Sequence, residues 1–487
     1  MSTPGVAGFA RIRVPHVFVL LTFMVLLAAL ATYVVPSGRY ERTRRAIEGR
    51  ERTLVVPGTY TPIPKVVTIG GALLGSPEPA AAPARPVSFL GFLSAIPRGM
   101  VEASDIIFFI FIIGGAFGIL QRSGTIMATV RGLMERLGHS APVLTVTVML
   151  ALAVGGSMLG MGEEFLPLVP VFLMIAARLG CDRLYGAALV LLGSFVGFAA
   201  ATTNPFTINV AQGIAELKLN SGLGLRLAFF AIAVPLAILH VLRYGRRLSR
   251  DPSSSLVPAE TIDVTPDTRE DEPFDGRHLM TLAVSLALFG AILWGVQFRG
   301  WWMTEMAGGF LLMGIAAAVI CRLPLAAASA AFVKGMEDMV VAALVVGFAR
   351  GVTVALSDGQ ILDTVVNSAA TALGSWPPVV SAWGMLLFQT ALNMLVPSGS
   401  GQATVTMPVM APLADVLGLT RQTAVLAFQF GDGLSNLIIP TSGLLMAMLA
   451  LARVPYASWL RFVLPLLAQL AILCVVFLLV AVTIGYR

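Results

Sequence analysis

The sequence predicts an all-α polytopic membrane protein built from two related halves, and three observations indicate this class. First, 57% of the 487 residues are hydrophobic and only 12% are charged, about half of the roughly 25% typical of soluble domains. Second, apolar runs long enough to cross about 30 Å of hydrocarbon recur along the chain. Third, the chain repeats itself at a nearly constant offset. The composition excludes a soluble enzyme and a disordered chain, and a net charge of only +6 argues against nucleic acid as a partner.

The apolar runs that we expect to span the membrane lie at 17–35, 105–121, 221–243, 277–297, 305–322, 337–357 and 457–484. Cleavage of the first run as a signal is one interpretation, but its length favours a retained helix. Residues 36–86 are rich in Pro, Gly and Arg, which predicts an extramembrane loop with little structure. Residues 244–276 carry arginines and then acidic residues, as expected of a flexible linker.

The repeat is visible as short matches about 235 residues apart. Gly124-Thr-Ile matches Gly359-Gln-Ile, and Ser157-Met-Leu matches Asn393-Met-Leu. The matches divide the chain into an N-terminal helix and external loop (1–85), a first unit (86–243), a linker with connecting helices (244–322) and a second unit (323–487).

Each unit contains the same unusual series of segments. An apolar span is followed by an amphipathic stretch ending in glycine, at 122–138 or 358–374. Next comes an apolar run broken by a polar, Gly-rich tip, at 160–164 or 397–402, which predicts a re-entrant hairpin. A long apolar stretch then breaks at 202–205 or 439–442, which predicts a discontinuous helix. Irregular backbone at membrane depth must line a cavity or pack inside protein. Half-helix ends that meet near one midplane site are typical of secondary transporters.

The distribution of arginine predicts the topology. With a cytoplasmic N-terminus, one crossing for each broken helix and none for each hairpin, the short basic segments fall on the inside, as the positive-inside rule requires. The second unit then begins on the opposite side from the first. The two units are therefore expected to be inverted repeats in the bacterial inner (plasma) membrane.

The first hairpin tip holds Gly162, Glu163 and Glu164. A carboxylate inside the membrane is costly and is a functional hypothesis by default. It could bind a cationic substrate group, coordinate Na⁺ or carry a proton; the alternative is a short tip that faces water at one membrane surface.

The second tip offers small hydroxyl, amide and glycine residues, which suit a ligand loop or a plain polar turn: Ser398, Gly399, Ser400, Gly401 and Gln402. We expect the two glycines to allow positive φ or a close approach of backbone to ligand.

Other candidates lie in or beside the broken segments. Asp432 lies deep within an apolar run, and Arg350 lies in the middle of the 337–357 span. Arg350 could neutralise Asp432 or a glutamate, or it could hold a substrate carboxylate. Glu102, Asp105, Glu337 and Asp338 are expected at the membrane interface. The helix breaks add polar residues and a proline, for which capping a half-helix is the main alternative to substrate binding: Asn204, Pro205, Thr207, Asn209, Thr441 and Ser442.

The sequence gives no indication of an enzyme, a metal centre or a bound cofactor. The three cysteines are far apart, and the four histidines lie at or beyond the ends of apolar segments. No zinc-protease, nucleophile-elbow or ATP-binding motif is present. Transport would therefore be driven by a gradient, with Na⁺ or H⁺ as the coupling ion, or by exchange. An intramembrane hydrolase that uses a tip serine has no mid-membrane histidine as its base. A channel is a further alternative, which the paired hairpins disfavour.

Several motifs together resemble the YfcC family within the wider ion transporter superfamily: Gly114-Gly-Ala-Phe-Gly118, Gly160-Met-Gly-Glu-Glu164, Asn204-Pro-Phe206, Ser398-Gly-Ser-Gly-Gln402, Ala427-Phe-Gln-Phe-Gly-Asp-Gly433 and Pro440-Thr-Ser442. The resemblance implies an elevator-type carrier, with a scaffold and a moving transport domain that holds both hairpins. It implies basic amino acids as substrates, with C4-dicarboxylates as the alternative, and a homodimer as one arrangement. Sodium and dicarboxylate carriers of the superfamily have Ser-Asn-Thr tips, so their ligands do not transfer here. The acidic residues favour a zwitterionic or cationic amino acid.

Overall fold

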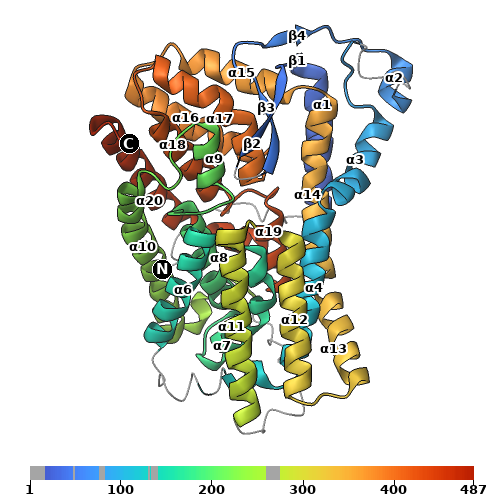
Figure 1. Ribbon diagram of the computed structural model, residues 1–487, viewed down its shortest axis with the longest axis vertical. Helices are drawn as coiled ribbons and strands as arrows, with labels where there is room; N and C mark the ends of the chain where they lie inside the picture. Colours follow the sequence, from blue (N-terminus) through green and yellow to red (C-terminus); the bar gives the residue numbers. More distant parts are fainter. Residues whose placement is uncertain (1–16, 48–49, 76–82, 130–131, 133–140, 259–274) are drawn as a thin grey trace, which may run out of the picture.

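The computed structural model describes residues 17–47, 50–75, 83–129, 132, 141–258 and 275–487 (Figure 1). Within these residues, eight helices are long and apolar enough to cross a membrane. Seven of them coincide with the seven predicted spans, and the eighth lies at Pro142–Leu159, in the first arm of the first predicted hairpin. The chain is therefore a multi-pass membrane protein.

The described helices follow the same order in the two units. The first unit contains α3 (Phe89–Glu102), α4 (Ser104–Arg122), α6 (Ala141–Leu159), α7 (Val169–Arg178), α8 (Arg183–Ala199), α9 (Ile208–Ile214) and α10 (Leu223–Arg250). The second contains α13 (Leu325–Asp338), α14 (Val340–Asp358), α15 (Leu362–Leu373), α16 (Pro378–Asn393), α17 (Gly399–Val416), α18 (Arg421–Ser435), α19 (Gly443–Leu451) and α20 (Tyr456–Thr483). Helices α1 (Val17–Val34), α11 (Gly276–Arg299) and α12 (Met303–Ile320) lie outside the two series. Residues 130–131 and 133–138 of the predicted amphipathic stretch 122–138 lie outside the described residues; its counterpart forms α15.

The two units pack against each other reciprocally. Helix α3 packs on α14, and its counterpart α13 packs on α4. Glycines let these helix backbones touch, as small residues do in membrane interfaces. A Cβ atom on Gly335 would lie 2.2 Å from the carbonyl oxygen of Gly114, and one on Gly99 would lie 2.6 Å from that of Gly347. These glycines therefore hold α3 against α14, and α13 against α4, at one close spacing and in one register.

The hairpins and broken helices form the other part of the fold. Helix α6 packs on α8, and α16 packs on α18. The same hydrogen bond ties each first arm to the following break: Thr203 Oγ1 donates to the Met158 carbonyl oxygen at 3.2 Å, and Thr441 Oγ1 donates to that of Met394 at 2.9 Å. In Figure 1, α6 and α7 lie in the lower half of the molecule and α16 and α17 in the upper half.

The segment 36–86 is more ordered than predicted, and its strands are an exception to the all-α class. Strand β1 (Ser37–Arg39) pairs antiparallel with β4 (Thr61–Ile63), and β2 (Arg42–Ile47) with β3 (Arg50–Val55); α2 follows at Ile69–Leu74. Tertiary contacts hold this ribbon: Asp363 of α15 accepts from the Tyr40 backbone N–H at 2.9 Å and from Arg42 Nη2 at 3.0 Å. Loop composition alone does not reveal an anchor so distant in sequence.

The first residues of the predicted linker 244–276 are helical and not a flexible segment. Helix α10 continues to Arg250, because Tyr244 and Leu248 are buried against the rest of the fold. Tyr244 donates its hydroxyl to Asp182 at the start of α8. Residues 259–274 of that linker lie outside the described residues.

Candidate functional site

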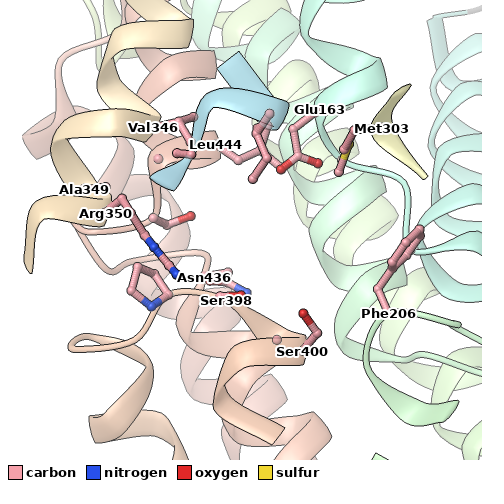
Figure 2. Close-up of a pocket in the computed structure, with 18 of the residues that line it drawn as sticks. Glu163, Phe206, Met303, Val346, Ala349, Arg350, Ser398, Ser400, Asn436 and Leu444 are labelled. Atoms are coloured by element: carbon pink, nitrogen blue, oxygen red, sulfur yellow. The ribbon is translucent and has the colours of Figure 1, made fainter. Parts of the chain in front are cut away.

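A cavity of about 340 Å³ lies between the two hairpin tips, where both units meet (Figure 2). Its size falls in the range of about 300–1,000 Å³ usual for small-molecule sites. Ten of the predicted site residues line it: Gly162, Glu163, Glu164, Thr207, Arg350, Ser398, Gly399, Ser400, Thr441 and Ser442. The other six predicted residues are not part of its lining: Asn204, Pro205, Asn209, Gly401, Gln402 and Asp432.

The first tip is shaped by glycines and by one of its two glutamates. Gly160 has φ +67°, and a Cβ atom there would lie 2.4 Å from Asn204 Oδ1, so only glycine fits. Glu164 is only 7% exposed, and its Oε2 accepts from the Gly162 backbone N–H at 2.8 Å. Glu163 is half-buried and faces the cavity (Figure 2). Glu164 thus holds the turn, while Glu163 offers a carboxylate to a ligand.

The second tip begins helix α17. Ser398 is the N-cap residue, and its hydroxyl accepts from the Gly401 backbone N–H at 3.3 Å. Neither Gly399 nor Gly401 has positive φ, so that part of the prediction was wrong. Close packing requires Gly399 instead, because its Cβ atom would lie 2.5 Å from Thr207 Cγ2. Ser400 lies beside the cavity at the lower end of the view in Figure 2.

Arg350 pairs with a carboxylate that the sequence analysis had assigned to the membrane interface. Its Nε donates to Glu102 Oε2 at 3.2 Å, and both side chains remain partly exposed, 36% and 43%. Among the described residues, the two terminal nitrogens of Arg350 have no hydrogen-bond partner. Asp432 is not its partner. The guanidinium therefore keeps both terminal nitrogens as hydrogen-bond donors for a ligand.

Sequence reasoning missed Glu102 and Asp105 as cavity residues. Both lie where α3 meets α4, and Asp105 Oδ2 accepts from Trp302 Nε1 at 3.4 Å. The repeat could not have found them, because their approximate counterparts behave differently. Glu337 and Asp338 are exposed and form ion pairs with Lys334.

Carboxyl groups outnumber basic groups in the cavity lining. Four carboxylates line it, from Glu102, Asp105, Glu163 and Glu164, against the single guanidinium of Arg350. The ring centroids of Phe206 and Trp302 lie 4.8 Å apart, and the two rings form an aromatic wall of the cavity. In Figure 2, Arg350 and Phe206 lie on opposite sides of the open space, with Glu163 above and Ser400 below.

Asn204 and Ser442 stabilise the helix breaks, whereas Gln402 and Asp432 lie elsewhere. Asn204 Oδ1 accepts from the Phe206 backbone N–H at 2.8 Å, and Ser442 caps α19 by accepting from the Leu445 N–H at 3.4 Å. Gln402 donates to the carbonyl oxygen of Gln389 at 2.9 Å. Asp432 is fully buried behind the cavity wall. Its carboxylate oxygens have no hydrogen-bond partner among the described residues.

Comparison with known proteins extends the resemblance to nearly the whole chain. A family model described as "C4-dicarboxylate anaerobic carrier" matches residues 14–483. The chain is 33% identical over 505 residues to the "Putative basic amino acid antiporter YfcC" of Escherichia coli (strain K12), covering 98% of each chain. It is 29% identical to an uncharacterised protein of Haemophilus influenzae, covering 80% of this chain and 77% of that protein.

Two solved transporters resemble the structure. The YdaH transporter of Alcanivorax borkumensis aligns with a TM-score of 0.46 and 16% identity, covering 97% of this chain and 99% of that one. MtrF of Neisseria gonorrhoeae, described with a class of antimetabolite efflux pumps, aligns with a TM-score of 0.44 and 16% identity, covering 96% of each. The family match over residues 14–483 and the 33% identity to YfcC settle the relationship: the chain is a membrane transporter of the C4-dicarboxylate anaerobic carrier family, of the YfcC type.

Proposed function

We propose that this protein is a secondary active transporter of the bacterial inner membrane that carries basic amino acids, of the arginine, ornithine and lysine type, by exchange or cation coupling. The acidic balance of the cavity is the observation that carries this proposal. Four carboxylates and one guanidinium suit a ligand with an extra positive charge. The same carboxylates would repel a dianion. The name of the E. coli relative points the same way.

The arrangement of the lining charges supports a specific pose. The two free terminal nitrogens of Arg350 suit the α-carboxylate of an amino acid, which they could bind bidentately. Glu163 suits the α-ammonium or the side-chain cation. The aromatic wall of Phe206 and Trp302, with Asp105 hydrogen-bonded to Trp302, would favour a guanidinium stacked on the rings.

An elevator mechanism is the second part of the proposal. The two hairpins lie toward opposite ends of the molecule, and their tips meet at one cavity (Figure 1). The reciprocal packing of α3 on α14 and of α13 on α4 supports inverted repeats that form a scaffold. Residues of α4 and α14 line the cavity from the scaffold side, and the tips line it from the mobile side. The arginine distribution supports a cytoplasmic N-terminus.

The alternative substrate is a C4-dicarboxylate, coupled to Na⁺ or H⁺. The description of the family and the single guanidinium favour it. For this substrate the lining carboxylates would have to be neutralised by coupling ions, one for each charge that faces the dianion.

The test is uptake of labelled arginine into proteoliposomes preloaded with ornithine, succinate or nothing, with and without Na⁺ and proton gradients. We expect ornithine inside to stimulate arginine uptake and succinate to have no effect. Glu163→Gln should reduce uptake at least tenfold, and Glu164→Gln less, because an amide oxygen can still accept from Gly162. The matched control is Glu337→Gln, on an exposed ion pair, which should transport normally. Succinate counterflow without arginine uptake would move the protein to the dicarboxylate alternative.

A further inference from the structure

Asp432 is a fully buried carboxylate that the cavity does not expose. It lies in α18 and is 0% exposed, and its carboxylate oxygens form neither a hydrogen bond nor an ion pair within the described residues. Its position is fixed relative to two cavity residues: a Cβ atom built on Gly399 would lie 3.1 Å from Asp432 Oδ2 and 2.5 Å from Thr207 Cγ2. Gly399 and Thr207 both line the cavity, so Asp432 lies directly behind that part of the wall.

An ionised carboxylate in such a place needs a compensating positive charge. The helices packed on α18 are α8, α9, α16, α17 and α20, and α9, α16 and α17 contain no basic residue. Helix α10 touches α18 through Phe229 and Phe430, and its buried Arg226 donates to the Thr202 and Ser221 carbonyl oxygens and to the Tyr486 hydroxyl. In α8, α18 and α20 the basic residues lie within the first six residues of each helix: Arg183, Arg421 and Arg461. Arg421 is already paired with Asp415 and Glu216. The first turn of α17, which begins at Gly399, offers only a partial positive charge.

Three buried side chains on the segments next to Asp432 hold oxygens without a partner, and Asn204 Nδ2 in the same helix break is a donor without one. The Thr207 hydroxyl and the amide oxygens of Gln402 and Gln429 are buried and have no partner within the described residues. Gln402 lies one turn after Gly399 on α17, and Gln429 lies one turn before Asp432 on α18. The amide nitrogens of both glutamines are already used: Gln402 donates to Gln389, and Gln429 donates to the Phe198 carbonyl oxygen at 2.8 Å. The amide orientations therefore leave oxygen atoms, not N–H groups, without partners.

This donor set has the chemistry of a cation site. Hard cations take oxygen ligands from carboxylates, amides and hydroxyls. A proton on Asp432 would supply only one donor and leave most of these oxygens unsatisfied. One carboxylate compensates one positive charge, which favours a monovalent ion over a divalent one.

We propose that Asp432 binds a sodium ion behind the wall formed by Gly399 and Thr207, with the Thr207 hydroxyl and neighbouring amide oxygens as further ligands. Gly399 begins the second hairpin's α17, and Thr207 lies in the first unit's helix break. The ion would therefore join the two units at the cavity wall. In transport, which rests on the proposed function, sodium would order this wall and act as the coupling ion. Binding itself does not depend on which substrate is carried.

The test measures sodium binding to the purified full-length protein as a rise in thermal stability. NaCl is titrated against choline chloride and KCl at constant ionic strength, first without substrate. We expect a saturable stabilisation that is specific to sodium and whose apparent affinity falls at least tenfold in Asp432→Asn. Thr207→Val, which keeps the side-chain shape, should weaken it several-fold and serves as the second variant if Asp432→Asn does not fold. The matched control, Asp415→Asn, removes an exposed carboxylate of α17 and should respond like the wild type.

Equal responses to sodium and choline in the folded wild type would overturn the proposal, as would an unchanged sodium affinity in both Asp432→Asn and Thr207→Val. Loss of a pH response in Asp432→Asn, with sodium inert throughout, would identify a proton site instead. Sodium binding without arginine transport would retain the cation site and refute the proposed substrate. Arginine transport without sodium binding would refute the cation site and retain the proposed substrate.

Discussion

Replacing Arg350 by glutamine should selectively weaken recognition of the substrate carboxylate. Arg350 Nε is engaged by Glu102, which leaves the two terminal nitrogens for a carboxylate. Hydrogen bonds to charged groups contribute about 1.5–3 kcal/mol each, so two at the lower value amount to about 3 kcal/mol. This is a factor of roughly 150 in affinity. The side chain is 36% exposed, and solvent screening could halve that energy, which sets the expected rise in KM at about 10- to 150-fold.

The assay compares uptake of arginine with uptake of agmatine, which is arginine without its carboxylate. Arg350→Gln should raise the KM for arginine and leave any agmatine uptake nearly unchanged. Arg350→Lys should give a KM for arginine between those of the wild type and Arg350→Gln, because lysine keeps the positive charge but lacks the planar guanidinium. The matched control is Arg98→Gln: Arg98 also joins α3 to α14, through Asp358, but lies outside the cavity lining.

Two results would refute this reasoning. One is an unchanged KM for arginine in a correctly folded Arg350→Gln protein. The other is full rescue of arginine uptake by the double substitution Arg350→Gln with Glu102→Gln. Rescue would mean that Arg350 serves only to neutralise Glu102 and does not touch the substrate.

Three further predictions concern stability. Gly335→Val should lower the thermal midpoint, since overpacking costs about 1–3 kcal/mol, while Gly290→Val, which meets no atom within 4 Å, should not; equal midpoints would contradict the close helix contact. Asn393→Ala removes the two N–H donors of Nδ2, which three acceptors share around the second helix break. Differential scanning fluorimetry should therefore show destabilisation by about 1–3 kcal/mol, and a neutral effect would argue against a stabilising role for these contacts. Arg45 and Arg421 lower the pKa of Glu216 by hydrogen bonding; a lowered folded pKa gives stability above the unfolded pKa that is lost as the pH falls. Arg45→Ala should therefore lower the thermal midpoint slightly at pH 7. The difference in midpoint between the wild type and the variant should shrink as the pH falls below about 4. A difference in midpoint that grows in acid would contradict the lowered pKa of Glu216.

The membrane architecture could be predicted because its signals are local. Each span is a continuous apolar run, and each tip or break is a short polar interruption in one. The acidic tip could be recognised for the same reason, because a carboxylate in an apolar run needs an explanation wherever it occurs. Seven helices of the structure accordingly coincide with predicted spans.

The parts that could not be predicted depend on contacts between distant segments. Glu102 and Arg350 are 248 residues apart, and they meet only because α3 packs on α14. The β-ribbon depends on Asp363, more than 300 positions away in the chain. The positive φ predicted for Gly399 was wrong, because a side chain at this position is excluded by Thr207 of the other unit and not by the backbone angle of Gly399.

The most direct test of the account is an experimental structure of the protein with arginine bound. We expect density for arginine in the cavity between the tips, with its α-carboxylate within hydrogen-bond distance of the Arg350 terminal nitrogens and a cationic group beside Glu163. Arginine bound elsewhere, or bound with its carboxylate toward Glu163 and away from Arg350, would contradict the proposed recognition.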